Sequence, residues 1–212
     1  MKQKPSLLYR FGVLLGRIVF HGFFCTRING RERVPVEGGL LIICNHISFF
    51  DPPLLGTASP RPVGFMAMAE LFRRPWMATI MRQLGVFSVD RSNSGHGAAR
   101  EGIRRLRAGL CVAIFPEGGI HTGKDSVLGG NPVFKPGAGA LALLGHATIL
   151  PVIVRDTRKP YSWRNWLRRE TISITFGYPF SLRLPHSLPM REQRALAREL
   201  LREQLLRTVE ID

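Results

Sequence analysis

The sequence predicts an α/β fold in which a mixed β-sheet is flanked by helices. Short apolar runs typical of buried strands alternate along the chain with segments of helical periodicity, and strands separated by helices indicate this class. Two of the apolar runs, residues 40–44 and 110–115, stop abruptly at polar residues and glycines. Sites in α/β sheets gather outside the carboxyl ends of the strands. We therefore expect a functional site where these two runs end.

The length and the charge of the chain limit the possible functions. Its 212 residues suit one domain with a sizeable core. The 30 lysines and arginines exceed the 15 aspartates and glutamates, and the formal net charge is +15. This excess predicts an anionic partner, which is a phospholipid surface, nucleotide phosphates or nucleic acid. The charge does not choose among them, and simple solubility is the plain alternative.

The first element is predicted to be a helix over residues 6–24. Its arginines interrupt the run of about 20 apolar residues that a membrane span needs, and it lacks the small-residue cleavage site of a secretory signal. A basic amphipathic helix in the membrane interface fits best, and an ordinary helix packed on the domain is the alternative. Arg10, Arg17 and His21 fall on one face. The apolar face consists of Leu7, Phe11, Leu14, Leu15 and Ile18.

The remaining elements follow from periodicity and from turn residues. Strands are predicted within residues 25–39 and over residues 40–44, 63–69, 87–89, 110–115, 149–154 and 172–176. Helices are predicted over residues 52–58, 70–84 with an interruption near Pro75, 97–108, from Pro136 onward, and 189–208. Residues 118–136 are rich in glycine, asparagine, aspartate and proline, which indicates a long loop over the site.

Two of these helices have a recognisable inner face. The inner face of helix 97–108, which Gly109 ends, consists of Ala99, Ile103 and Leu106. Its outer face carries Arg100, Arg104 and Arg107, which are either solvated or in contact with a membrane or a coenzyme. The last helix presents an apolar side made of Leu196, Leu200, Leu201 and Leu205.

The first candidate site follows the apolar run 40–44. His46 and Asp51 stand there in the pattern Asn-His-x4-Asp. An imidazole at a strand end, backed by a carboxylate, is the minimum equipment for taking a proton from a hydroxyl. The alternative is structural, because Asp51 and Pro52 also make a good helix start and His46 could hydrogen-bond a turn.

Four blocks, taken together, resemble the glycerolipid acyltransferase family. Residues 45–51 are similar to its Asn-His-x4-Asp motif, and residues 115–118 to its Phe-Pro-Glu-Gly motif. Residues 85–91 resemble its Gly-x-x-Phe-x-x-Arg block, and residues 149–153 its apolar Val-Pro-Val-type block. The blocks occur in the family's order, and the similarity is greatest to bacterial 1-acyl-glycerol-3-phosphate acyltransferases.

The resemblance implies transfer of a fatty acyl group from acyl-CoA or acyl-carrier protein to the free hydroxyl of 1-acyl-glycerol-3-phosphate, which gives phosphatidate. His46 would be the base, and Asp51 would orient its ring; no cofactor is expected besides the acyl donor. The sequence has no Gly-x-Ser-x-Gly elbow, which argues against a serine acyl-enzyme. Ser48 lies in the His46 motif, but it would need a base of its own as a nucleophile.

The resemblance also implies a set of substrate-binding residues. Arg91 and Glu117 would hold the glycerol phosphate of the acceptor, although a surface turn and a helix cap are their structural alternatives. Lys135 is a further candidate for a phosphate or thioester-oxygen contact, with a solvated lysine as the alternative. The predicted binding residues are Asn45, Arg91, Glu117, Gly118 and Lys135. One departure from the family's pattern is Ile120, which stands where an arginine is often found.

The predicted partners are a membrane phospholipid surface, a lysophospholipid acceptor and the acyl donor, without nucleic acid. We expect residues 1–30 to associate with the membrane and residues 31–212 to form the catalytic domain, at the cytoplasmic face of the inner membrane. Two alternatives are an acyltransferase for a different lysolipid, which Ile120 motivates, and a non-catalytic basic protein that binds membrane or nucleic acid. Cys25, Cys44 and Cys111 are too few for a disulfide framework and lack metal-ligand spacing, so we expect a reducing compartment and no zinc site.

Overall fold

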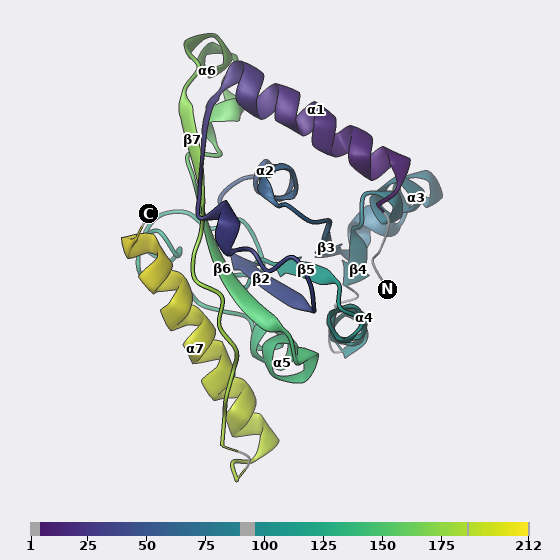
Figure 1. The fold of residues 1–212 in the computed structure, drawn as a ribbon, viewed down its shortest axis with the longest axis vertical. Coiled ribbons are helices and arrows are strands. Elements are labelled where there is room, and N and C mark those ends of the chain that lie inside the picture. Colours follow the sequence, from purple (N-terminus) through teal and green to yellow (C-terminus); the bar gives the residue numbers. More distant parts are fainter. Residues whose placement is uncertain (1–4, 90–95, 186, 212) are drawn as a thin grey trace.

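A computed structural model describes residues 5–89, 96–185 and 187–211 (Figure 1). The strands are β1 (Cys25–Asn29), β2 (Leu40–Cys44), β3 (Val63–Met68), β4 (Phe87–Val89), β5 (Cys111–Ile114), β6 (Thr148–Arg155) and β7 (Thr171–Phe176). The α-helices are α1 (Leu7–Phe23), α2 (Asp51–Ala58), α3 (Pro75–Gln83), α4 (His96–Arg107), α5 (Pro136–Gly145), α6 (Trp163–Arg168) and α7 (Met190–Glu210). Short 3-10 turns are η1 (Arg31–Arg33), η2 (Ala69–Phe72) and η3 (Lys159–Tyr161).

The strands form one seven-stranded sheet in the order β1-β7-β6-β2-β5-β3-β4. The pairs are parallel except for β6 and β7, which are antiparallel, so the sheet is mixed and the predicted fold class is confirmed. The central strands β6, β2 and β5 are parallel neighbours. Their carboxyl ends therefore lie at one edge of the sheet, and the segments that leave them can meet there.

The core forms one layer on each face of the sheet, because successive side chains of a strand point to opposite faces. Leu40, Ile42 and Cys44 of β2 belong to the layer that α1 and α2 cover. Leu41 and Ile43 belong to the layer that α4, α5 and α7 cover. All five residues of β2 are buried, as expected for a strand with helices on both sides.

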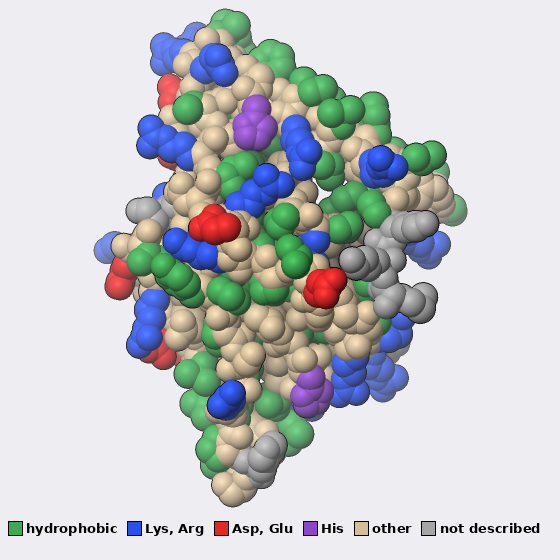
Figure 2. Space-filling model, viewed as in Figure 1, with side chains coloured by type: hydrophobic (Ala, Val, Ile, Leu, Met, Phe, Trp, Pro, Cys, Tyr) green, Lys and Arg blue, Asp and Glu red, His purple; other side chains and the backbone are tan. Residues whose placement is uncertain are grey.

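Helix α1 packs on the domain through the face opposite to its apolar stripe. A Cβ at Gly16 would lie 2.5 Å from Cγ2 of Thr57, so the glycine permits the close approach of α1 to α2. The Tyr9 hydroxyl accepts a hydrogen bond from the Val63 backbone N–H at 2.9 Å. Figure 2 shows hydrophobic side chains along the upper right edge, where α1 lies in Figure 1. The exposed apolar residues of this helix include Leu7, Phe11, Leu14, Leu15 and Ile18.

The predicted helix 6–24 is thus confirmed as a helix, and the apolar face found in the sequence is turned outward. That this face lies in a membrane interface stays a prediction. No helix in the described ranges is both long and apolar enough to cross a membrane. The division at residue 30 also stays a prediction, although β1 lies within the first segment and pairs with β7 of the sheet.

The structure differs from the sequence-based predictions at a few elements. Helix α6 and the turn η3 were not predicted, since neither is long enough to show a periodic pattern. Residues 70–84 divide into η2 and α3, with the break just before Pro75 as predicted. On α7, Leu196 is more than a third exposed, and Ala197 takes a fully buried position beside Leu201 and Leu205.

Candidate active site

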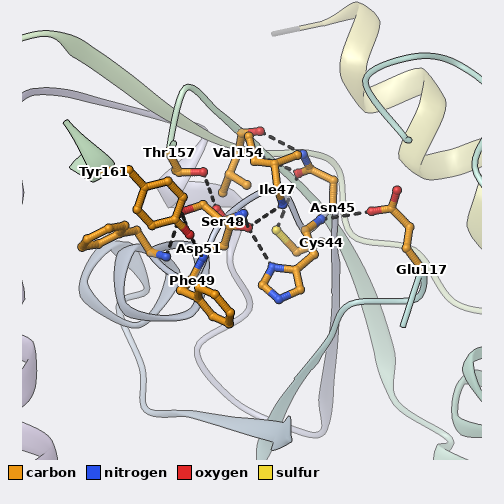
Figure 3. A network of polar contacts seen from close by, with 12 residues as sticks. Cys44, Asn45, Ile47, Ser48, Phe49, Asp51, Glu117, Val154, Thr157 and Tyr161 are labelled. Carbon is orange, nitrogen blue, oxygen red and sulfur yellow. Dashed lines mark hydrogen bonds and ion pairs between the residues drawn. The ribbon is translucent and has the colours of Figure 1, made fainter. Parts of the chain in front are cut away.

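Asn45 fixes the end of β2 to the neighbouring strand β6. Its side-chain amide donates to the Val154 carbonyl at 2.9 Å, and its carbonyl oxygen accepts from the Val154 backbone N–H at 2.8 Å (Figure 3). The side chain is fully buried. These two hydrogen bonds extend the pairing of β2 with β6 beyond Cys44. The predicted role of Asn45 in substrate binding stays a prediction.

His46 follows directly and forms a pair with Asp51, the first residue of α2. The distance between His46 Nδ1 and Asp51 Oδ2 is 2.8 Å. The imidazole ring is stacked on Phe115, which leaves β5, with 4.1 Å between the ring centroids. Nε2, the other ring nitrogen, has no hydrogen-bond partner within the described residues. The ring is therefore fixed on one side and available to a ligand on the other.

The Asp51 carboxylate accepts hydrogen bonds from backbone and side-chain donors of the described residues (Figure 3). Its Oδ2 also accepts from the backbone N–H groups of Ile47 at 2.7 Å and Ser48 at 2.8 Å. Its Oδ1 accepts from the hydroxyl of Thr157. Three donors besides the imidazole therefore surround this fully buried carboxylate.

These contacts determine which nitrogen of His46 can act as a base. An ionised carboxylate only accepts hydrogen bonds, so the nitrogen that faces Asp51 must carry the proton. In the neutral ring Nε2 is then unprotonated and holds a free lone pair. His46 can therefore accept a proton from a ligand hydroxyl at Nε2 while Asp51 stabilises the imidazolium. The arrangement is that of a Ser-His-Asp triad without the serine.

Glu117 connects the two loops that leave β2 and β5. Its Oε2 accepts from the His46 backbone N–H, and its Oε1 accepts from the Val127 backbone N–H, both at 3.0 Å. Burial raises the pKa of the Glu117 carboxyl above its ordinary value, and the two backbone hydrogen bonds partly offset that increase. The carboxylate of Glu117 thus contacts the main chain of the site, and its predicted role in substrate binding stays a prediction.

Gly118 and Lys135 lie together at the exit of β5. Gly118 has a φ of +78°, and a Cβ there would lie 2.7 Å from Cγ of Lys135. The aliphatic part of Lys135 therefore lies across Gly118, in the space that any larger residue would fill. The Lys135 backbone N–H donates to the Pro116 carbonyl at 2.8 Å, so the loop 118–135 returns to its starting point before α5 begins.

The structure brings five of the seven predicted site residues to one edge of the sheet, with Asn45 beneath them and Arg91 outside the described residues. Sequence reasoning missed Thr157 and Tyr161, which follow β6. The Tyr161 hydroxyl accepts from the Phe49 backbone N–H at 2.9 Å and from the Ser48 hydroxyl at 3.2 Å. No motif in the sequence marks either residue, because their partners lie more than 100 positions earlier.

The described residues contain no group of three or more histidine, cysteine, aspartate or glutamate side chains arranged to hold a metal ion. The three cysteines are free, with Cys25 exposed and Cys44 and Cys111 buried. Burial raises the pKa of the Cys44 thiol well above its ordinary value and that of Cys111 to about 12.

The fold is α/β, and the His46–Asp51 pair is a candidate general base at the carboxyl ends of its central strands. The sequence model of the acyltransferase family matches residues 25–155, and the chain belongs to this family. The resemblance inferred from the four sequence blocks is therefore confirmed. An acyltransferase is an enzyme, so the alternative of a non-catalytic basic binding protein is set aside.

Three similar proteins show how far the likeness extends. The 1-acyl-sn-glycerol-3-phosphate acyltransferase of Bacillus subtilis is 28% identical over 181 residues, which are 85% of this chain and 86% of the relative. That of Borreliella burgdorferi is 32% identical over 61% of this chain and 51% of its own length. The crystal structure of the 1-acyl-sn-glycerophosphate acyltransferase of Thermotoga maritima superposes with a TM-score of 0.67 at 22% identity, over 96% of this chain and 77% of that one. This last likeness supports the fold.

Proposed function

We propose that the protein is a 1-acyl-sn-glycerol-3-phosphate acyltransferase, which moves a fatty acyl group from a thioester to the free hydroxyl of 1-acyl-glycerol-3-phosphate and forms phosphatidate for phospholipid synthesis. One observation carries the proposal. His46 is bound to Asp51 through Nδ1, and its Nε2 is free of protein partners within the described residues of an acyltransferase chain. The names of the relatives from Bacillus subtilis and Borreliella burgdorferi support the choice of acceptor.

The transfer needs a base and no covalent enzyme intermediate, because a thioester is already activated. Nε2 of His46 takes the hydroxyl proton while the acceptor oxygen attacks the thioester carbonyl carbon. The C–S bond then breaks, and the leaving thiolate takes the proton from the imidazolium, so that an ester, a free thiol and a neutral His46 result. Asp51 stabilises the imidazolium between these steps. A positioned base of this kind contributes roughly 10²–10⁴-fold to the rate.

Recognition of the acceptor phosphate is assigned to Arg91, which lies outside the described residues, and to Lys135. Arg91 offers the planar fork that suits phosphate, and Lys135 reaches across Gly118 beside the site. The thioester comes from acyl-CoA or from acyl-carrier protein, and the chain needs no other cofactor for this chemistry. A second acceptor is favoured by Ile120, a partly exposed apolar residue in the loop beside His46, which offers no cation to a phosphate. This second candidate is an acyltransferase for a different lysolipid.

The lipid acceptor reaches the enzyme from a membrane surface in this proposal. The outward apolar stripe of α1, with Arg10 and Arg17 exposed beside it, has the composition of a helix that lies in a bilayer interface. The net charge of +15 favours anionic lipid. We place the protein on the membrane, at the cytoplasmic face of the inner membrane.

An acceptor screen with the purified protein in detergent tests the function. Thiol release from acyl-CoA is expected when 1-acyl-glycerol-3-phosphate is present and absent without an acceptor. The same screen includes zwitterionic lysolipids and uncharged monoacylglycerol, and acyl-carrier protein replaces acyl-CoA in a parallel series. If a lysolipid without the phosphate monoester is the better acceptor, the assignment passes to the second candidate. If no acceptor releases thiol, the proposal is wrong.

A further inference from the structure

The connection between β6 and β7, residues 156–170, holds the catalytic loop from one side. Thr157 is fully buried, and its hydroxyl donates to the Asp51 carboxylate. Four residues later, the Tyr161 hydroxyl accepts from the Phe49 backbone N–H and the Ser48 hydroxyl (Figure 3). The Tyr161 contacts fall within the short loop between His46 and α2, and the Thr157 contact falls on Asp51, the first residue of α2. The position of this loop therefore depends on a segment outside the matched range 25–155.

The outer side of the same connection is apolar and basic. Trp163 and Leu167 stand one turn apart on α6 and are 69% and 77% exposed. Arg164, Arg168 and Arg169 are exposed around them. Large apolar side chains surrounded by arginines are typical of a surface that inserts among lipid headgroups. A single exposed apolar residue needs no explanation, but two large apolar side chains exposed on one six-residue helix do.

Helix α6 lies against the carboxyl end of α1 (Figure 1). The Trp166 ring packs against Phe23 and Phe24, with 5.3 Å between the ring centroids in both pairs. The Arg169 guanidinium donates to the His21 carbonyl at 3.2 Å. The occupant that fits is an anionic bilayer, because the surface continues the outward stripe of α1 and carries arginines throughout.

We infer that residues 156–170 form a second lipid contact, and that an anionic bilayer bound at α6 holds the loop of His46 and Asp51 in its catalytic position through Thr157 and Tyr161. The inference rests on the proposed function for its effect on turnover. The contact itself requires only that Trp163 and Leu167 bind lipid. A bilayer shifts the loop toward its catalytic position only if it binds residues 156–170 more tightly when Thr157 and Tyr161 are hydrogen-bonded to the loop.

The lipid contact is tested with the full chain carrying Trp163→Ser and Leu167→Ser together. Binding is measured by sedimentation with vesicles of phosphatidylglycerol and phosphatidylcholine. The double variant is expected to bind at least roughly tenfold more weakly, since burial of one such side chain alone accounts for that factor. The control is Met190→Ser, an exposed apolar residue at the start of α7, at the far end of the molecule from α6 (Figure 1). It is expected to bind as the wild type does.

Turnover is measured with long-chain lysophosphatidate in the vesicles and with a short-chain form in solution. The ratio of the vesicle rate to the solution rate is expected to fall at least roughly tenfold in the double variant, in line with its loss of binding, and to stay at the wild-type value in Met190→Ser. Unchanged binding and an unchanged ratio would overturn the inference. So would a loss of self-association in place of lipid binding, because the surface would then belong to a second copy. A wild type that transfers nothing would refute the proposed function, whereas the sedimentation result would still decide the contact.

The link between the lipid contact and the catalytic loop is tested with substitutions that should leave lipid binding unchanged. Tyr161→Phe keeps the ring and removes the hydroxyl, and Thr157→Val removes the donor to Asp51. Both are expected to lower kcat on vesicles several-fold with unchanged KM and unchanged sedimentation, and Thr157→Ser is expected to restore kcat. Thr157 and Tyr161 are positioning residues in this scheme. Equal kcat in the valine, serine and wild-type proteins would overturn the link.

Discussion

The loop after β2 and the loop after β5 leave neighbouring parallel strands, and each depends on one buried carboxylate. Asp51 is 0% exposed and Glu117 is 1% exposed, and each accepts two backbone N–H groups. The difference lies in the remaining partners. Asp51 also contacts the imidazole of His46 and the hydroxyl of Thr157. The hydrogen bonds of Glu117 within the described chain go to the main chain alone.

This difference in partners predicts a catalytic role for Asp51 and a structural role for Glu117. In the proposed mechanism, Asp51 sets the tautomer of the ring and stabilises its positive charge, so it takes part in proton transfer through His46. Glu117 holds the backbone of His46 and the backbone of Val127, so it fixes where the two loops stand. Of the two buried carboxylates, only Asp51 faces the ring of the candidate base.

The largest expected effect is that of His46→Ala. The substitution removes the only ring that the Asp51 carboxylate contacts among the described residues, and turnover should fall by roughly 10²–10⁴-fold. The circular dichroism spectrum and melting temperature should change little. His146→Asn is the matched control, because His146 is exposed with a φ of +48°, which asparagine tolerates. Turnover above about a tenth of the wild-type value would contradict the role of a general base.

Asp51→Asn should have the second largest effect. It keeps the size of the side chain and removes the charge that fixes the proton on Nδ1. A charge-assisted hydrogen bond is worth about 1.5–3 kcal/mol, so kcat should fall by about 10–150-fold. The measurement is steady-state kinetics with saturating acyl donor and acceptor. A normal kcat with a raised KM would show that Asp51 binds substrate and would remove the distinction from Glu117.

Glu117→Gln should affect stability at least as clearly as activity. One backbone N–H would face an amide donor in a buried place, which costs about 1–3 kcal/mol of the free energy of unfolding. Urea denaturation measures this change, with Glu203→Gln on α7 as the exposed control, for which we expect less than about 1 kcal/mol. The loss of kcat should be smaller than for Asp51→Asn. A large loss of kcat at unchanged stability would instead place Glu117 on the substrate.

The smallest expected effect concerns the thiols of the two strands. Cys44 ends β2 and Cys111 begins β5, and burial raises the pKa of both thiols. At about pH 8 both should stay protonated and unreactive, since the thiolate is the reactive form. A chromogenic thiol reagent should therefore modify Cys25 alone in the native protein and all three cysteines in urea. Modification of Cys44 or Cys111 in the native protein at this pH would contradict the prediction.

Much of the fold could be predicted because its signals are local. The runs 40–44 and 110–115 become β2 and β5, and both deliver site residues at their carboxyl ends as predicted. The roles of Asn45 and Glu117 could not be predicted in the same way. Their partners are backbone groups of Val154, 109 positions away, and of His46, 71 positions away. Such contacts exist only after β6, β2 and β5 have paired in register.

The sequence by itself determined which groups reach the edge of the sheet, because burial periodicity and strand ends are properties of a short stretch of chain. It supplied the candidate base His46, the carboxylate Asp51 that pairs with it, and an amphipathic first helix. The tertiary structure decided which carboxylate faces the imidazole, and that the apolar stripe of α1 is turned outward. It also brought Thr157 to Asp51 across 106 positions. The physical reason is that hydrogen-bond partners and exposed faces depend on which strands and helices lie side by side, which no single segment encodes.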